Sequence, residues 1–270
     1  MPTARVNGVK LHYVEAGKGD ETIVFAHGLL MSSRSFSEQL RFFSDRYRVV
    51  AYDHRGHGAS ATPWGGYDMD TIAEDAAQLI EHLGAPVHFA GLSMGGFVGI
   101  RLAARRPQLI RSLVLMATSA DEQPGNKAVA HAVTGLVRVA GFRPIAKPAV
   151  RAMFGAPYLC DQRHFEAAIA YVNALPKSLW RPLTAVVDRP SVAHELKRIG
   201  CPTLVLVGDC DTLLPPPNSL RLATGIRGAE LVRIPNTGHL ITDENPDAAN
   251  AAIDRFLSRT TKRPSAFAAT

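Results

Sequence analysis

The sequence Gly91-Leu92-Ser93-Met94-Gly95-Gly96 separates a short apolar stretch, residues 87–90, from a helical pattern that runs from about residue 95 to residue 105. A nucleophilic serine on a tight turn between a buried strand and a helix needs small residues two positions away on either side, because their missing side chains let the hydroxyl project above the sheet. The N-terminus of the following helix also favours a developing oxyanion. The pattern therefore indicates Ser93 as a nucleophile, with a glycine-rich turn and a capping serine as the alternative.

Strand and helix patterns alternate on both sides of this turn. A continuous apolar run, which is typical of a strand covered on both faces, lies at residues 22–26, and further strand patterns lie at residues 47–52, 87–90 and 113–116. Helical patterns lie between them at about residues 35–43, 71–82 and 95–105. The second of these helices opens with Thr71-x-x-Glu74, the pattern of a capping box, and Asn7-Gly8 near the start of the chain is a two-residue hairpin signal. This alternation predicts a mostly parallel sheet with helices on both faces.

The alternation stops between residues 121 and 194, which contain helical stretches punctuated by prolines but no convincing strand. It resumes with strand patterns at residues 203–207 and 230–234 and a helical pattern over about residues 247–258. We therefore expect an α/β core of residues 1–120 and 195–258, a helical insertion of residues 121–194 and a frayed C-terminal tail of residues 259–270.

A serine nucleophile needs a base. His239 comes shortly after the strand expected over residues 230–234, in Pro235-Asn236-Thr237-Gly238-His239. Because the carboxyl ends of parallel strands meet at one edge of a sheet, this histidine is expected at the same edge as Ser93. Its position after the last strand, with Gly238 to shape the loop, predicts that His239 is the base.

The base in turn needs an acid that orients it. The apolar run 203–207 ends at the same edge in Gly208-Asp209-Cys210-Asp211. Either Asp209 or Asp211 could hold the histidine, and Asp121 is a more distant third candidate. All three aspartates could instead be ordinary turn formers, since aspartate is common in loops.

An oxyanion hole needs backbone N–H groups, one from the residue after the serine and one from a loop after an early strand. Met94 supplies the first, and Leu29 in His27-Gly28-Leu29-Leu30 offers the second. We expect His27 to hold this loop in place rather than to take part in the chemistry.

Metal and nucleotide cofactors have little support in the sequence. His54 and His57 are three residues apart, but the glycines around them indicate a tight loop, and no further cluster completes a metal site. Neither Gly-x-Gly-x-x-Gly nor a Walker sequence is present, so we expect no cofactor and no metal.

The composition excludes several classes of protein. The 270 residues are 46% hydrophobic and 20% charged, and no apolar run reaches the roughly 18 residues that span a bilayer. The net charge of +6 comes partly from residues 121–194, where nine Lys and Arg face five Asp and Glu, but no nucleic-acid-binding motif accompanies it. Three cysteines cannot pair completely, and the first residues lack a secretory pattern, so we expect a cytoplasmic protein.

These motifs together resemble the α/β-hydrolase superfamily. The resemblance covers about residues 22–120 and 195–258 and rests on five motifs in order: His27-Gly28, Asp53-x-Arg55-Gly56-x-Gly58-x-Ser60, Gly91-x-Ser93-x-Gly95-Gly96, Gly208-x-x-Asp211 and Gly238-His239. It implies an α/β fold with a mostly parallel eight-stranded sheet flanked by helices, and a helical cap after the sixth strand. The Gly-x-x-Asp pattern of the family selects Asp211 over Asp209 as the acid.

The resemblance implies a serine hydrolase of carboxylic esters or lactones that acts through an acyl-enzyme. The segment around Ser93 looks like the 3-oxoadipate enol-lactonases, whereas residues 63–71 look like the cofactor-free haloperoxidase and perhydrolase esterases. Perhydrolysis and C–C bond hydrolysis on the same triad are therefore the alternatives, and a ligand receptor on a hydrolase scaffold is a third. As partners we expect a small-molecule ester or lactone, with a homodimer left open, and neither nucleic acid nor a membrane.

The insertion carries many apolar side chains that either roof a hydrophobic substrate pocket or pack the insertion onto the core. They are Val129, Val133, Leu136, Val137, Phe142, Ile145, Met153, Phe154, Phe165, Leu175, Leu179 and Trp180. The excess of basic residues in the same segment could attract an anionic substrate or only solvate the surface. A hydrophobic acyl or alcohol group is the substrate expected from the first of these patterns.

Overall fold

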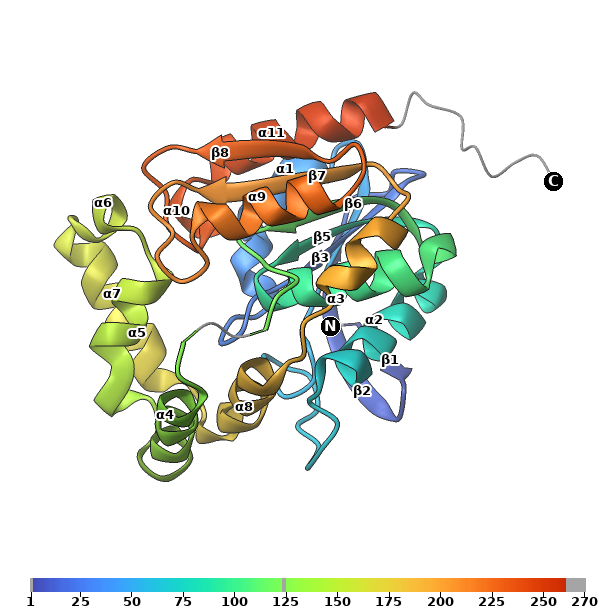
Figure 1. Cartoon of the computed structure of the whole chain (residues 1–270). Coiled ribbons are helices and arrows are strands. Elements are labelled where there is room, and N and C mark those ends of the chain that lie inside the picture. The colour runs from blue at the N-terminus through green and yellow to red at the C-terminus, as the bar shows by residue number, and fades with distance from the viewer. Residues whose placement is uncertain (1, 123–124, 261–270) are drawn as a thin grey trace.

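The computed structural model describes residues 2–122 and 125–260 and contains one eight-stranded sheet (Figure 1). The strands follow the order β1-β2-β4-β3-β5-β6-β7-β8. β3 to β8 pair in parallel, whereas β1 pairs antiparallel with β2 and β2 antiparallel with β4. The strands are β1 (Thr3–Val6), β2 (Val9–Ala16), β3 (Thr22–Ala26), β4 (Arg48–Tyr52), β5 (Val87–Leu92), β6 (Ile110–Met116), β7 (Thr203–Gly208) and β8 (Glu230–Ile234). The expected mostly parallel sheet is confirmed.

Helices cover both faces of this sheet, and the alternation of side chains along each strand explains why. In β3, Val24 and Ala26 belong to the hydrophobic cluster beneath α2, α3 and α9, whereas Ile23 and Phe25 belong to the cluster beneath α1 and α11. β3 therefore fills two cores at once, which explains the continuous apolar run at residues 22–26. The helices are α1 (Ser37–Phe43), α2 (Met69–Leu83), α3 (Met94–Arg105), α9 (Pro216–Gly225), α10 (Ile241–Glu244) and α11 (Pro246–Thr260).

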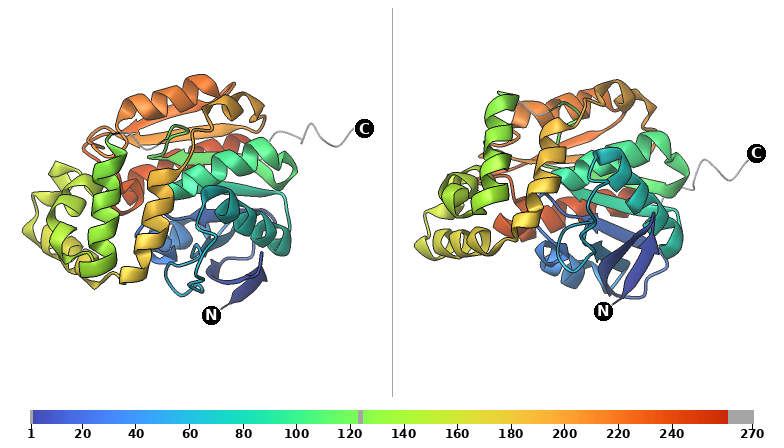
Figure 2. Two further views of the ribbon diagram at one scale, coloured as in Figure 1. Left: turned by 60° about the horizontal axis from the view of Figure 1, so that its bottom comes forward. Right: turned by 90° about the horizontal axis from the view of Figure 1, so that it is seen from below.

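Within the described residues, five α-helices form the insertion between β6 and β7, which was expected to be helical. They are α4 (Lys127–Ala140), α5 (Ala146–Met153), α6 (Ala156–Leu159), α7 (Gln162–Ala174) and α8 (Trp180–Asp188). In all views these helices gather on one side of the core, coloured green to yellow (Figure 1, Figure 2). Short 3-10 helices connect several elements: η1 (Ser33–Phe36), η2 (Pro107–Leu109), η3 (Arg143–Ile145), η4 (Lys177–Leu179) and η5 (Ala193–Arg198).

Several helix ends differ from those expected. α2 begins at Met69, two residues before the expected start, because the side chain of Asp68 accepts the backbone N–H of Thr71 at 2.9 Å and caps the helix there. The helix expected over residues 35–43 is a 3-10 turn followed by the shorter α1. α11 continues to Thr260, so the first two residues of the expected tail are helical; residues 261–270 of that tail lie outside the described residues.

Within residues 2–122 and 125–260, the helices are all too short or too polar to cross a bilayer.

Candidate active site

Ser93 lies on a sharp turn between β5 and α3. Its φ is 51° and its ψ −110°, a left-handed backbone conformation that a residue with a side chain rarely adopts. Neighbouring groups hold this turn: the Ser93 N–H donates to the carbonyl of Met116 at 2.8 Å, and the Thr118 hydroxyl donates to the Ser93 carbonyl at 2.8 Å. The strain at the serine is thus opposed by hydrogen bonds to the end of β6 and the residues after it.

The flanking glycines are required by close packing of backbones rather than by their own conformation. A Cβ at Gly91 would lie 2.3 Å from the carbonyl oxygen of Gly95, and a Cβ at Gly95 would lie 2.0 Å from the carbonyl oxygen of Ala26. Both distances are far inside van der Waals contact. The small residues on either side of Ser93 therefore let the strand, the turn and the helix lie directly against β3.

His239 follows β8, and its ring is held by Asp211 after β7. The distance from His239 Nδ1 to Asp211 Oδ2 is 2.9 Å, and the two side chains are 3% and 0% exposed. The other oxygen of Asp211 accepts the backbone N–H groups of Leu213 and Leu214, each at 2.9 Å. Because both oxygens are engaged, the carboxylate has one orientation, and Nδ1 of His239 is the donor toward it.

The other two candidate acids contact different groups. Asp209 Oδ1 accepts the backbone N–H of Thr237 at 3.4 Å, and Asp121 Oδ2 accepts Nε of Arg221 at 2.9 Å. Of the three aspartates named from the sequence, Asp211 is the one that the structure places against His239.

The loop before His239 is held by Glu244, the last residue of α10. Glu244 Oε2 accepts the N–H of Gly238 at 2.8 Å, and Oε1 accepts the N–H of Leu240 at 3.1 Å, so one carboxylate binds the residues on both sides of His239. Burial raises the pKa of Glu244, while the N–H groups that it accepts act in the opposite direction. The same Oε2 also accepts the N–H of Gly155 in the insertion at 2.9 Å.

The two candidate oxyanion donors belong to segments next to Ser93: the start of α3 and the turn after β3. Met94 is the first residue of α3, so its N–H has no acceptor within the helix. Leu29 belongs to a turn closed by a hydrogen bond from Met31 N–H to the Gly28 carbonyl at 3.2 Å, and a Cβ on Gly28 would lie 3.3 Å from Ser93 Cβ. The turn that carries Leu29 is therefore in contact with the serine.

His27 holds this turn in place with hydrogen bonds. Its Nδ1 lies 2.7 Å from the Gly28 carbonyl, and its Nε2 accepts the N–H of His54 at 3.0 Å, so both nitrogens of the buried ring are occupied. Burial lowers the pKa of His27, and also those of His54 and His57, which favours neutral rings. Within the described residues, no group of three or more His, Cys, Asp or Glu side chains is arranged to hold a metal ion.

Ser93 and His239 line one cavity of about 200 Å³ between the core and the insertion. Apart from these two, its wall is apolar or glycine: Gly28, Leu29, Leu30, Phe97, Val133, Phe142, Ile145, Ala149, Ala152, Met153, Leu183, Val186, Val187, Leu213, Leu214 and Leu240. Of the apolar insertion residues singled out in the sequence, Val133, Phe142, Ile145 and Met153 are in this wall. The others do not line it, and Val129 is 60% exposed.

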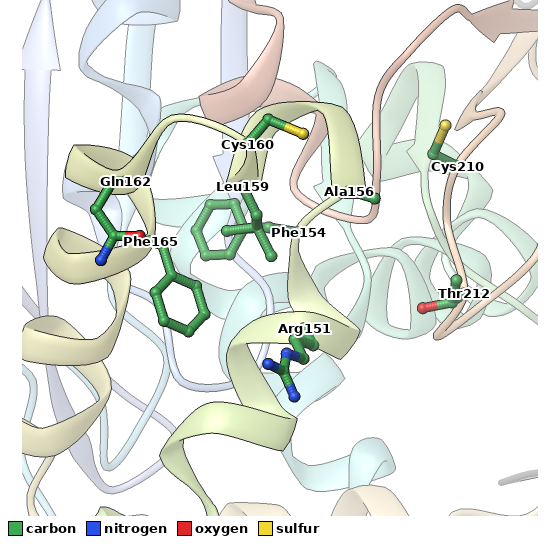
Figure 3. A pocket seen from close by; sticks show the side chains of 9 residues that line it. All are labelled: Arg151, Phe154, Ala156, Leu159, Cys160, Gln162, Phe165, Cys210 and Thr212. Atoms are coloured by element: carbon green, nitrogen blue, oxygen red, sulfur yellow. The ribbon is translucent and has the colours of Figure 1, made fainter.

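A second, more open cavity of about 650 Å³ lies between the insertion and the loop after β7 (Figure 3). Phe154, Leu159 and Phe165 line it from the insertion, and Cys210 and Thr212, the neighbours of Asp211, line it from the core. A hydrogen bond with the Asp209 side chain raises the pKa of the Cys210 thiol. Because the thiolate is the reactive form, this contact lowers the reactivity of the cysteine beside the acid.

Two hydrogen bonds between the insertion and the loops of the site could not be predicted from the sequence. Besides the Gly155–Glu244 hydrogen bond, the Tyr171 hydroxyl in α7 donates to the carbonyl of Leu30 at 2.6 Å, next to the candidate oxyanion donor Leu29. Both contacts join residues more than 80 positions apart in the chain, so no local pattern signals them. The only local hint was the acidic residue five positions after His239.

The chain is similar in sequence and structure to known hydrolases. The model of the alpha/beta hydrolase family matches residues 23–252. The chain is 29% identical over 260 residues to 3-oxoadipate enol-lactonase 2 of Acinetobacter baylyi, covering 95% of this chain and 96% of the relative. It is 27% identical to the serine hydrolase BPHL of Mus musculus, covering 93% of this chain and 84% of the relative. The crystal structure of the enol-lactonase from Burkholderia xenovorans LB400 superposes with a TM-score of 0.88 at 29% identity, covering 95% of this chain and 100% of that chain.

Proposed function

Since the chain belongs to the alpha/beta hydrolase family, we propose that it is a serine hydrolase that cleaves carboxylic esters or lactones of small hydrophobic substrates. The observation that carries the proposal is the apolar cavity lined by both Ser93 and a histidine whose Nδ1 is held 2.9 Å from Asp211. The relatives named as a serine hydrolase and as enol-lactonases support the same reaction class.

In the proposed mechanism His239 is the general base. Asp211 keeps the proton of the neutral ring on Nδ1, so that Nε2 is free to take the proton of Ser93 as Oγ attacks the substrate carbonyl. The buried carboxylate then stabilises the imidazolium that forms. His239 returns the proton to the leaving alkoxide, and the acyl group remains on Ser93.

The backbone N–H groups of Leu29 and Met94 hold the tetrahedral oxyanion in this proposal. One such donor typically stabilises the transition state by about 3 kcal/mol. A water molecule activated by His239 then attacks the acyl-enzyme, the same two N–H groups stabilise the second tetrahedral oxyanion, and the acid is released. The contact of the Gly28 turn with Ser93 supports the assignment of Leu29, and the position of Met94 at the start of α3 supports its own.

The wall of the cavity favours a neutral, apolar substrate. A charged acyl group would be buried among leucine, valine and phenylalanine side chains, with His239 as the one titratable side chain in the wall. Burying an unpaired charge is strongly unfavourable. The basic residues of the insertion lie outside this wall, so their charge supplies no partner there. The volume of about 200 Å³ is below the roughly 300 Å³ of drug-sized sites and favours a small acyl group.

The proposal is tested by hydrolysis of a p-nitrophenyl ester series, from acetate to decanoate, by the wild type and by Ser93→Ala. We expect turnover that is highest for the shorter chains and a loss of at least about a thousandfold in the variant. A p-nitrophenyl ester with a terminal carboxylate on the acyl chain is the control for charge, and we expect it to be a poorer substrate than its neutral analogue.

Equal hydrolysis by the wild type and Ser93→Ala would contradict the serine mechanism. If the folded wild type hydrolyses every ester only at the background rate, lactones are the next substrates to test. Peroxide with a carboxylic acid then tests perhydrolysis, and vinylogous diketones test C–C bond cleavage. Tight ligand binding that survives Ser93→Ala without turnover would instead identify a receptor.

A further inference from the structure

The backbone around His239 packs against the insertion with no side chain between them. A Cβ on Gly238 would lie 2.1 Å from the backbone nitrogen of Gly155, and a Cβ on Gly155 would lie 2.8 Å from the backbone nitrogen of Gly238. On the other side of the loop, a Cβ on Gly208 would lie 2.2 Å from the carbonyl oxygen of Gly238. Three glycines thus bring β7, the histidine loop and the insertion into direct backbone contact.

Glu244 closes this contact with hydrogen bonds. Its Oε2 is shared by the N–H groups of Gly238 and Gly155, at 2.8 and 2.9 Å, and its Oε1 binds the N–H of Leu240. A carboxylate accepting backbone N–H groups makes shorter and stronger hydrogen bonds than a neutral acceptor does. It is also the side chain that can accept all three of these donors with two oxygens and present no donor of its own.

We propose that Glu244 is a positioning residue for the hydrolysis, and that its carboxylate fixes the His239 loop by joining it to Gly155 of the insertion. The inference rests on the proposed function, because it concerns the base of that reaction. Its consequence is that the placement of α5 and α6 sets the position of the imidazole. The insertion then acts on the catalytic step itself and not only on substrate entry.

The test compares Glu244→Gln with the wild type per active site. Glutamine nearly preserves the size of the side chain, but its NH₂ group replaces one acceptor and faces a backbone N–H. We expect kcat to fall by about ten- to a hundredfold with KM changed by less than about twofold, because a small misplacement of a catalytic group acts mainly on the chemical step. Sites are counted by complete labelling with a fluorophosphonate, so loss of folded protein is separated from slower turnover.

The matched control is Glu195→Gln. Glu195 is 4% exposed and paired with Arg105 at 2.7 Å, on η5 and outside the lining of the Ser93 cavity. This variant should lower the melting temperature and keep the wild-type kcat per labelled site. A kcat of Glu244→Gln within twofold of the wild type, or an equal fall in Glu195→Gln, would overturn the proposal.

If Glu244→Gln does not fold, Glu244→Asp takes its place, since its shorter side chain keeps the charge but cannot span all three donors.

Amide hydrogen exchange gives a readout that does not depend on the reaction. In Glu244→Gln we expect faster exchange both in peptides that contain Gly238 and Leu240 and in the insertion peptide that contains Gly155, with neither change in Glu195→Gln. Unchanged exchange in these peptides overturns the inference. Equal hydrolysis by the wild type and Ser93→Ala overturns the proposed function instead, so the two failures are distinguishable.

Discussion

The two oxygens of the Asp211 carboxylate contact different groups, and this division decides what its replacement would do. Oδ2 lies 2.9 Å from His239 Nδ1, and Oδ1 accepts two backbone N–H groups of the same loop. An asparagine here would keep its oxygen toward the two N–H donors, since its NH₂ group cannot accept them. The NH₂ group would then face Nδ1 of His239.

We predict that Asp211→Asn lowers kcat by about a thousand- to ten-thousandfold, because an NH₂ group facing Nδ1 favours the tautomer whose Nε2 carries the proton and cannot act as a base. Steady-state hydrolysis of the best p-nitrophenyl ester measures this loss. Asp209→Asn is the matched control and should stay within about threefold of the wild type, since Asp209 contacts Thr237 instead. Similar losses in both variants would contradict the assignment of Asp211.

The residues of the site differ in how far they could be predicted from the sequence. Ser93 was recognisable because its turn is local and needs Gly91 and Gly95 within two residues. The choice between Asp209 and Asp211 required a family pattern, because it depends on a contact with His239, which lies 28 positions away. Glu244 was missed, since its link between the histidine loop and Gly155 forms only when the insertion packs against that loop.

At the scale of the elements, the backbone of the insertion packs closely against the core at Gly155, which precedes α6. Its φ of −67° is open to any residue, so glycine is needed there for space alone. A methyl group would meet Gly238 N at 2.8 Å and Glu244 Oε2 at 3.0 Å. The backbones would have to separate to admit it.

We predict that Gly155→Ala lowers kcat by about tenfold or more, because the added methyl group displaces the histidine loop. Ester hydrolysis per labelled site measures it. Gly135→Ala is the control within the insertion: Gly135 is exposed in α4, and a Cβ there meets nothing within 4 Å. That variant should keep the wild-type kcat and gain a few tenths to about 1 kcal/mol of stability from its higher helix propensity. Wild-type kcat in Gly155→Ala would contradict the close contact described here.

The ends of elements were the least predictable feature at this scale. Thr71 was expected to cap α2, but Asp68 does so, and the Thr71 hydroxyl donates to that cap at 2.7 Å. Both residues are good capping types, and the choice depends on the backbone before the helix. Strand positions were predicted better, since a strand buried on both faces must be apolar throughout.

Across the whole molecule, the buried histidines link stability to pH. Burial, the largest influence, lowers the pKa of His57 to about 3, whereas the unfolded chain has a value near 6.5. Between these two values the unfolded state binds a proton that the folded state does not, so the free energy of unfolding falls as the pH falls. The slope is about 1.4 kcal/mol per pH unit for one such group well inside this window.

We predict that His57→Gln reduces the loss of stability between pH 6.5 and pH 4.5 by roughly 2 kcal/mol, because it removes this one proton-binding difference. Urea unfolding at the two pH values measures the change. Asp243, whose pKa burial raises to about 7, contributes in the opposite direction, but it is present in both proteins and cancels in the comparison. An equal loss in the wild type and the variant would show that His57 titrates alike in the folded and unfolded states.

The mostly parallel sheet and the place of the insertion followed from the alternation of patterns, whereas the order of the strands did not, and the match to residues 23–252 confirms the family that the motifs indicated. The size and lining of the cavity could not be predicted from these sequence patterns. Four of the apolar insertion residues line it and the rest of that set do not, which depends on how five helices pack and not on their composition.

Two hydrogen bonds between the insertion and the loops of the site, Tyr171 to Leu30 and Gly155 to Glu244, have a consequence for protein engineering. A chimera that takes its lid from another hydrolase exchanges more than a specificity element. The donor segment must also bring a hydroxyl for the loop after β3 and a side-chain-free position opposite Glu244. Grafts designed without these two features should bind new substrates more readily than they turn them over.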